Sequence, residues 1–270
     1  MDLVIFAGPV IVKPSFKQIP WRRPTTIIPI VGSGSTFFAN LASQLRDSNG
    51  RVLPGLLRRY AGVERSQVDK VAMCSFSAGW GLLNSMFRNE ADRREVNACV
   101  LSDSAFGAGL HGHAAYAADA ILGRCLTVAT TTNNSANPQL GIMRTARQTW
   151  REIQEEAIEA SGCHCQPNAR KAREPMPAPS GGVWNTGSLL YWYDYVVPGS
   201  PDNQGDDFTH VQHHDMAALA WTAYLAPYFN GEGMGEGLIP SWKAAVGVGI
   251  AATGLGVGYY LYRTRKRRAA

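Results

Sequence analysis

The sequence predicts an α/β fold, a mostly parallel sheet with helices on both faces, together with one C-terminal transmembrane helix. Short apolar, β-branched segments at residues 25–31, 71–77 and 96–101 alternate with segments of helical periodicity, which is the pattern of a parallel sheet. Residues 244–262 form an uncharged stretch of the length that a membrane helix needs. The 270 residues, 45% of them hydrophobic, suffice for one sizeable core plus an appendage.

The net charge of +5 belongs to the end of the chain. Residues 263–268 alone carry five basic side chains, so the remainder of the sequence is neutral. No basic patch interleaved with aromatic residues occurs elsewhere, and this argues against a nucleic-acid-binding protein.

The five cysteines do not form a metal motif. Cys74, Cys99 and Cys125 lie in apolar runs, where free cysteine behaves as a small hydrophobic residue. Residues 163–165 (Cys-His-Cys) resemble half of a zinc site, but no second Cys or His pair stands at a matching spacing. We expect no metal, and either a local disulfide or free surface thiols at residues 163–165.

The first two strands are expected before residue 32. Residues 3–12 predict an early strand pair interrupted at Gly8-Pro9 rather than a signal peptide, because a basic n-region is missing. Residues 25–31 predict a strand by their β-branched content. Pro29 disfavours a central position for that strand, since proline cannot donate to the hydrogen-bond ladder.

A Gly-rich turn at residues 32–35 (GSGS) leads into a helix expected at residues 36–46. Ser35 or Thr36 is the expected cap, and the helical spacing falls on Phe37, Leu41 and Leu45. A strand, a Gly-rich turn and a helix upstream of a nucleophilic serine are where an oxyanion donor belongs. The backbone N–H groups of Ser33, Gly34 and Ser35 are the candidates. A phosphate-binding loop is the weaker alternative, since the Gly-Lys-Ser/Thr and G-x-G-x-x-G signatures are both absent.

Residues 71–81 (VAMCSFSAGWG) contain the candidate nucleophile. An apolar strand breaks at Ser77 and passes at once into a helix, and residues beside such a serine must be small because the turn is tight. Ser77 would project from the carboxyl end of the sheet, with the N–H of Ala78 as one oxyanion donor. The alternative is an ordinary strand-to-helix turn, and Ser75 replaces the first glycine of the usual G-x-S-x-G.

The following strand supplies a candidate acid. After a helix through Leu56, Leu57 and Tyr60 and the serine turn, residues 96–101 predict a strand that closes with Ser102, Asp103 and Ser104. Asp103 therefore ends a buried strand at the same sheet edge as Ser77, where a carboxylate can orient an imidazolium. A strand-end aspartate that caps a turn is the alternative.

The second half continues the alternation and then breaks it. A helix at residues 113–122, a strand at 125–130 and an amphipathic helix at 140–160 are expected. The apolar face of that helix carries Met143, Ala146, Trp150, Ile153 and Ala157. Residues 161–187 predict a lid-like or flexible insertion.

A last strand at residues 188–197 precedes a polar loop, 198–208, and a closing helix through Phe229. His210 lies in the loop before that helix and is the candidate base. His213 and His214 are expected at the helix start, and His111 and His113 in a loop.

This order of elements resembles the α/β-hydrolase superfamily across about residues 25–230. The resemblance implies a serine hydrolase of the esterase or lipase type with the triad Ser77, Asp103 and His210 in that chain order. It implies an acyl-enzyme, a small-molecule or lipid-like acylated substrate, and no cofactor. The oxyanion hole would consist of Ala78, Ser33 and Gly34.

The sequence departs from the superfamily pattern in three ways. GSGS replaces the usual His-Gly oxyanion sequence, and the strand between the oxyanion helix and the serine turn is short or missing. The acid most often follows a later strand, where this chain has Asn133-Asn134. Asp207 is the fallback acid, and Asp194 is a poorer one.

The C-terminal region predicts a membrane anchor beyond a hydrolase-like domain of residues 1–230. Residues 231–243 are a Gly-rich linker, 244–262 a single transmembrane helix with aromatic residues at both ends, and 263–270 a basic tail. Gly254 and Gly258 form GxxxG, which predicts self-association of helices in the membrane. The side of the membrane stays open, since the positive-inside rule puts the tail in the cytoplasm but no export signal is evident.

Two other classes of function fit the same sequence. The first is a non-catalytic hydrolase-like scaffold that serves as a membrane-anchored binding module. The second is a structural or pore-like membrane protein, of a virion for example, in which the Gly-rich segment is the active part.

Overall fold

The computed structural model describes residues 1–9, 16, 18–104, 106, 109–132, 146–163, 170–172, 189–195, 217–218 and 220–232. The chain divides into two units, Met1–Met234 and Gly235–Ala270, and every described residue belongs to the first. Among the described residues no helix is long and apolar enough to cross a membrane. Residues 244–262 lie outside them, so the predicted anchor stays a prediction.

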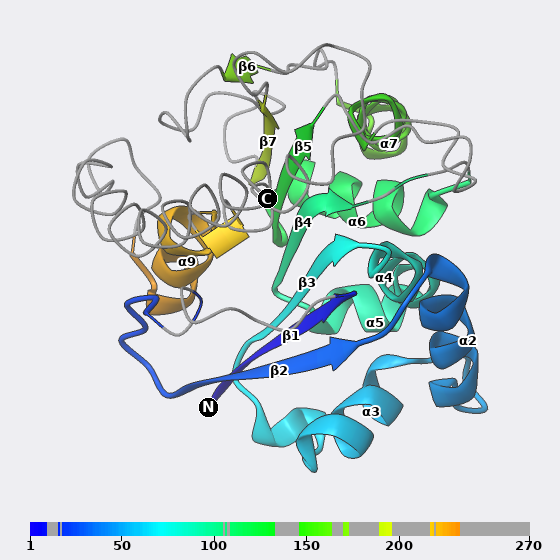
Figure 1. The fold of residues 1–270 in the computed structure, drawn as a ribbon, viewed down its shortest axis with the longest axis vertical. Helices are drawn as coiled ribbons and strands as arrows, with labels where there is room; N and C mark the ends of the chain where they lie inside the picture. Colours follow the sequence, from blue (N-terminus) through cyan, green and yellow to red (C-terminus); the bar gives the residue numbers. More distant parts are fainter. Residues whose placement is uncertain are drawn as a thin grey trace, which may run out of the picture. The chain divides into compact units, whose positions relative to one another are not determined.

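The core of the first unit is a seven-stranded sheet in which every strand pair is parallel. This confirms the predicted α/β fold with a parallel sheet (Figure 1). The strand order is β2-β1-β3-β4-β5-β7-β6. The bounds are β1 (Asp2–Gly8), β2 (Thr25–Val31), β3 (Val71–Ser77), β4 (Ala98–Ser104), β5 (Leu126–Thr132), β6 (Arg170–Ala172) and β7 (Leu190–Tyr195).

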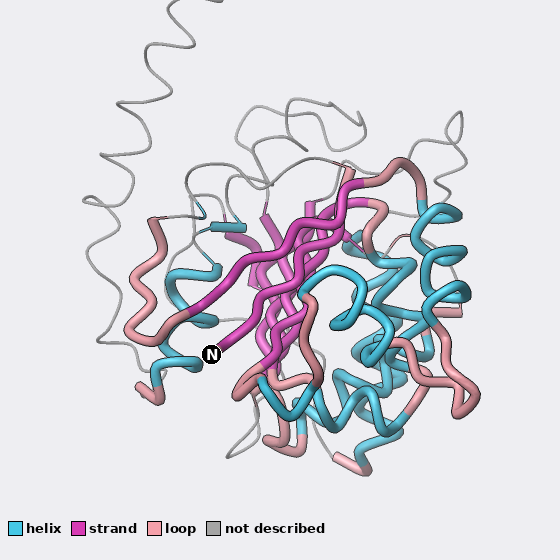
Figure 2. Tube along the Cα trace, turned by 90° about the horizontal axis from the view of Figure 1, so that it is seen from below, coloured by secondary structure: helices cyan, strands magenta, loops and turns pink. Residues whose placement is uncertain are grey.

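Helices cover both faces of the sheet, as Figure 2 shows. Successive residues of β1 enter two different core clusters, Leu3 and Ile5 one, Val4 and Phe6 the other, because neighbouring strand side chains point to opposite faces. The first cluster is covered by α2 (Ser35–Leu45), α3 (Leu53–Leu56) with its π-helical extension η1 (Leu57–Ala61), α4 (Trp80–Phe87), α6 (His111–Ile121) and α7 (Ala146–Ser161). The second is covered by the π-helical η4 (Trp221–Leu225) and by α9 (Ala226–Asn230).

The sheet order accounts for Pro29. β2 is an edge strand that pairs with β1 alone, in a register that sets Pro29 opposite Phe6. Among the described strands none pairs with its outer edge, so a residue without an N–H is tolerated there. The expectation that Pro29 disfavours a central strand is therefore confirmed, and its exposed ring fits an edge position.

The helix after β2 differs in detail from the prediction. Gly34, with φ 77°, is its N-cap residue, not Ser35 or Thr36. Phe38 is buried, whereas Phe37 is 42% exposed. Leu41 and Leu45 are buried as predicted. Phe38 replaces Phe37 on the buried face because α2 packs its Phe38 and Leu41 side against α4, a contact that local periodicity does not contain.

Other boundaries also move. β4 extends through Ser104, so Asp103 lies within the strand rather than after it. His111 and His113, expected in a loop, belong to the first turn of α6. The 161–187 insertion contains a three-residue edge strand, β6, that pairs with β7.

Some predictions hold, and others concern residues outside the described ranges. Within residues 46–70, all described, helices α3, η1 and η2 (Arg65–Gln67) occur and no strand, as the sequence indicated. The buried face of α7 comprises the predicted Ala146, Trp150, Ile153 and Ala157. Of the early strand pair only β1 is described, and Met143 lies outside the described ranges.

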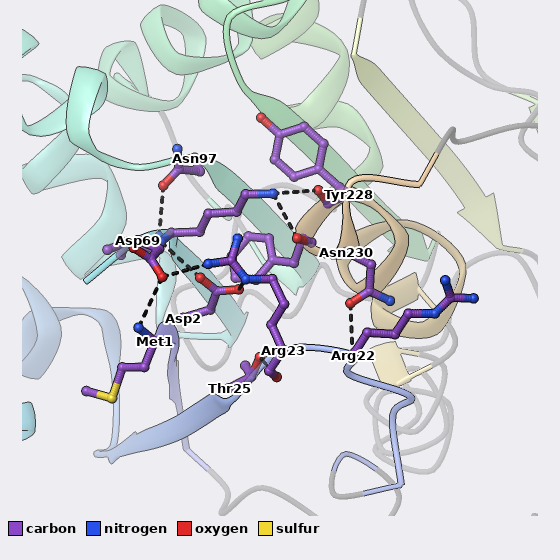
Figure 3. A network of polar contacts seen from close by, with 12 residues as sticks. Met1, Asp2, Arg22, Arg23, Thr25, Asp69, Asn97, Tyr228 and Asn230 are labelled. Atoms are coloured by element: carbon purple, nitrogen blue, oxygen red, sulfur yellow. Dashed lines mark hydrogen bonds and ion pairs between the residues drawn. The ribbon is translucent and has the colours of Figure 1, made fainter. Parts of the chain in front are cut away.

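A charged network ties the amino-terminal edge of the sheet to the last described helix (Figure 3). The buried Asp2 carboxylate accepts the Lys70 backbone N–H at 3.2 Å and lies 3.5 Å from the Arg23 guanidinium. The Lys70 ammonium donates to the carbonyls of Tyr228 and Phe229 at 3.0 and 2.8 Å. Partial burial lowers the pKa of Lys70. Lys70 thus satisfies carbonyls at the carboxyl end of α9, where a cation is favoured.

A second buried carboxylate fixes the segment that leads into α3. Asp92, in helix α5 (Glu90–Glu95), is fully buried. It accepts the backbone N–H groups of Val52 and Leu53 at 2.6 and 3.3 Å, and the Arg51 guanidinium at 3.2 Å. Burial raises the pKa of Asp92, and these hydrogen bonds oppose the rise.

We expect Asp92→Ala to lower the free energy of unfolding by about 3 kcal/mol, because two buried backbone donors and a guanidinium lose their acceptor. Urea titration would measure the change. Glu90→Ala is the matched control in the same helix, since Glu90 makes only an exposed pair with Arg94 and should change stability little. Equal effects of the two variants would contradict this role of Asp92.

Candidate active site

Ser77 occupies a strained strand-to-helix turn. β3 ends at Ser77, α4 begins at Trp80, and the N–H of Gly79 donates to the carbonyl of Phe76 at 3.1 Å. Ser77 has φ 50°, a left-handed conformation that costs a residue with a side chain about 1–2 kcal/mol. Such strain concentrates at functional sites, where surrounding structure enforces it.

The turn approaches its neighbours so closely that only glycine fits at two positions. A Cβ on Gly79 would lie 2.0 Å from the Ala7 carbonyl oxygen of β1. A Cβ on Gly81 would lie 2.7 Å from the Ser35 carbonyl oxygen of α2. The turn is therefore wedged between the end of β1 and the start of α2, which explains the small residues around Ser77.

Ser77 also lies where the order of strands reverses direction. β1 is followed along the chain by β2 on one side of it, and β3 to β5 are added on the other side. In open parallel sheets ligands bind outside the carboxyl ends of the strands at this switch point. Ser77, at the carboxyl end of β3 beside β1, has that location.

Asp103 is a second strained residue, on the neighbouring strand. Phe76 pairs with Ser102 and Ser77 with Ser104, so Asp103 is the extra residue of a bulge in β4. It is fully buried and has φ 41°. In the described part of the chain, Ser77 and Asp103 are the two non-glycine residues with positive φ. The structure therefore brings together the backbones of the predicted nucleophile and acid.

Two buried hydroxyl groups join these strands just below Ser77. The Ser75 and Ser104 oxygens are 2.8 Å apart, and the Ser104 hydroxyl donates to the Ser77 carbonyl at 2.9 Å. Both side chains are at most 2% exposed. The sequence predicted no role for Ser104, and its adjacency to Asp103 was the one signal that pointed to it.

The predicted oxyanion residues are set apart from Ser77 by one strand. Ser33 and Gly34 follow β2, and β1 lies between β2 and β3. The turn at residues 32–35 still lies near the turn after Ser77, because α2, which follows the first turn, contacts α4 at Ser35 and Gly81. Helix α2 has no acidic residue in its first turn and no side-chain cap, so its amino-terminal N–H groups can receive negative charge.

The end of β1 is the nearer neighbour, and the sequence did not reveal it. A Cβ on Gly8 would lie 3.2 Å from the Phe76 carbonyl oxygen, directly before Ser77. Gly8 also accepts the N–H of Gly32 at 3.2 Å, so it connects the two turns. The position of Gly8 beside Phe76 became evident only from the strand order, which sets β1 next to β3.

The two histidines in the described ranges serve other contacts. His111 is 68% exposed, with Nδ1 2.7 Å from a Glu156 carboxylate oxygen on α7. His113 is buried, and its ring donates to the Trp80 carbonyl at the start of α4. Its Nε2 has no hydrogen-bond partner. His210, Asp207, His213 and His214 lie outside the described residues, as does the side chain of Asp194.

Three thiols are inert by their surroundings. Cys74, Cys99 and Cys125 are free and buried, and burial raises the pKa of each, that of Cys125 to about 12. They fill space as small hydrophobic residues, as predicted. Cys163 is disulfide-bonded, which favours the first of the two alternatives expected for residues 163–165. Within the described residues no cluster of three or more metal-ligating side chains exists.

No protein-family model matches the chain. A stretch of 87 residues, 32% of this chain, is 30% identical to a Kelch repeat-containing protein of Arthroderma benhamiae. The match spans only 13% of that protein. This similarity therefore gives the chain neither a family nor a function.

His113 makes stability depend on pH. Burial lowers its pKa from 6.5 to about 4, and the hydrogen bond to Trp80 only partly opposes this. Between these values the unfolded chain binds a proton that the folded chain does not. We expect the contribution of His113 to be complete above about pH 6.5 and to fall by up to roughly 3 kcal/mol as the pH approaches 4.

Urea unfolding between pH 4 and 7.5 would measure this slope. His113→Asn keeps an N–H donor but cannot titrate, and should flatten the curve. Ser43→Ala, an exposed residue of α2 that does not titrate, should leave the curve unchanged. Parallel curves for wild type and His113→Asn would rule out this source of acid sensitivity.

Proposed function

We propose that this protein is a membrane-anchored serine hydrolase that cleaves an ester through Ser77, His210 and Asp103. The observation that carries the proposal is the left-handed backbone of Ser77 (φ 50°) at the carboxyl end of β3, at the topological switch point of a parallel sheet. Strain of this kind in a serine needs a reason, and exposure of a nucleophilic oxygen at a strand-to-helix turn supplies one.

The chemistry is acyl transfer. His210 takes the proton of the Ser77 hydroxyl as the Ser77 oxygen attacks the ester carbonyl, and Asp103 stabilises the resulting imidazolium. The oxyanion forms toward the N–H of Ala78 and the turn at Ser33 and Gly34. The C–O bond to the leaving alcohol then breaks, and the alcohol takes the proton from His210.

Water completes the cycle. His210 removes a proton from water, the hydroxide attacks the acyl-enzyme, and the free acid leaves as Ser77 regains its proton. These steps use no metal or organic cofactor.

The surface beside the site supports an apolar acyl group. Val31 and Phe37, 45% and 42% exposed, flank the turn at residues 32–35. Exposed large hydrophobic side chains on both sides of the candidate oxyanion turn suit a hydrocarbon chain better than a charged one. An anchor at residues 244–262 would keep the enzyme close to lipid-like substrates.

A fluorophosphonate probe tests the nucleophile. Attack by the Ser77 oxygen on phosphorus releases fluoride and leaves a stable adduct, so wild type should be labelled and Ser77→Ala should not. We expect His210→Ala and Asp103→Asn to be labelled roughly 10³-fold more slowly than wild type, because proton removal and imidazole orientation are lost. Ser43→Ala, an exposed serine of α2, is the control and should react like wild type.

A folded wild-type protein that neither reacts nor hydrolyses short aryl esters would reject the hydrolase. The non-catalytic scaffold and the structural membrane protein would then be the remaining alternatives.

The anchor has its own test. Full-length protein should stay with membranes in alkaline carbonate, and Ile250→Arg with Leu255→Arg should release it, since each arginine at a helix centre costs about 2.5–3.5 kcal/mol of insertion free energy. Ala269→Arg adds a charge to the tail and should change nothing. Wild-type protein that carbonate extracts is not an integral membrane protein.

A further inference from the structure

Ser75 and Ser104 form a directed hydrogen-bond chain. The Ser104 hydroxyl has one hydrogen, and it is donated to the Ser77 carbonyl at 2.9 Å. The 2.8 Å contact between the Ser75 and Ser104 oxygens must therefore use the hydrogen of Ser75. The chain runs from Ser75 through Ser104 to Ser77.

This chain acts on the backbone of the candidate nucleophile itself. The neighbouring carbonyls of the turn are satisfied locally, because Phe76 accepts from Gly79 and Ala78 accepts from Gly81. The Ser77 carbonyl receives instead a side-chain donor from the adjacent strand. A hydroxyl buried to 2% exposure has few alternative rotamers and partners, so this bond fixes the peptide plane that follows Ser77.

The same chain spans the bulge in β4. Ser104 directly follows Asp103, the extra residue of that bulge, and pairs with Ser77 across the strands. The hydrogen bond from Ser104 to Ser77 thus holds both residues with left-handed backbone, Ser77 as its acceptor and Asp103 as the residue before its donor. A change at Ser104 would loosen both.

We propose that Ser104 is a positioning residue for the Ser77 nucleophile, with Ser75 acting through it. The inference rests on the proposed hydrolase function and explains why serine, rather than the usual glycine, stands two residues before Ser77. Ser75 is small enough for the tight turn, and its hydroxyl orients Ser104. Neither side chain touches the substrate.

The test compares Ser104→Ala, Ser75→Ala and the double variant. Loss of the Ser104 bond should lower kcat for an aryl ester and the fluorophosphonate labelling rate by about 10- to 100-fold, since a misplacement of about 1 Å costs on the order of 10²-fold. KM should stay within about twofold, because substrate binding is untouched. Ser104→Thr, which keeps the hydroxyl, should recover most of the lost rate.

The double variant separates positioning from general weakening of the fold. Ser75→Ala alone should slow labelling about threefold, and Ser75→Ala added to Ser104→Ala should have no further effect, because Ser75 acts only through Ser104. Thr127→Val is the control, since it deletes a buried hydroxyl of the same sheet that has no hydrogen-bond partner. It should leave kcat unchanged.

The outcomes separate the two proposals. Wild-type protein that reacts, while Ser104→Ala reacts at the same rate, overturns the positioning role and leaves the hydrolase intact. Effects of Ser75→Ala and Ser104→Ala that multiply overturn the action of Ser75 through Ser104. Failure of wild type to react overturns both. Should Ser104→Ala not fold, Ser75→Ala decides, and a wild-type labelling rate in that variant overturns the inference.

Discussion

The structure depends on the approach of the turn after Ser77 to the end of β1. The absence of a side chain at Gly79 lets the backbone pass beside the Ala7 carbonyl oxygen, where a Cβ would lie only 2.0 Å away. That approach turns β3 into α4 within three residues, forces Ser77 into a left-handed conformation, and brings Gly81 against the first turn of α2. A serine on a wider turn would need none of these features.

The two edges of the sheet have different chemistry. At the amino-terminal edge, ion pairs and a lysine clamp hold the strand ends and α9 together. At the carboxyl edge, neutral hydroxyl groups from β3 and β4 hold the turn, and Asp103 is the acidic residue beside them. In the proposed hydrolase, this separation would leave stabilisation of the oxyanion and the imidazolium to groups near Ser77, and a few fixed dipoles suffice for such stabilisation.

Local sequence patterns predicted most of the fold, whereas the geometry around Ser77 depends on long-range contacts. The strand at 71–77, the helix after it and the edge position of β2 followed from β-branched runs, helical spacing and Pro29. The bond between Ser75 and Ser104 joins residues 29 positions apart, and its existence depends on a bulge that no local pattern encodes. The burial of Phe38 in place of Phe37, and of His113 in a helix, likewise depends on α4 as a neighbour.

Strand order bears on the choice of acid. β4 is the immediate neighbour of β3, so Asp103 lies about 4.8 Å along the sheet from the strand of Ser77. Asp194 lies in β7, where it pairs with Thr131 of β5. β7 is three strands away from β3, which corresponds to roughly 14 Å across the sheet. An imidazole that accepts from Ser77 and donates to a carboxylate must contact both within hydrogen-bond distance. In the proposed triad, Asp103 therefore has the shorter distance to Ser77, and Asp194 the longer. In this proposed triad, the strain at Asp103 would have the same explanation as the strain at Ser77, since both backbones would be bent so that one imidazole can meet two side chains.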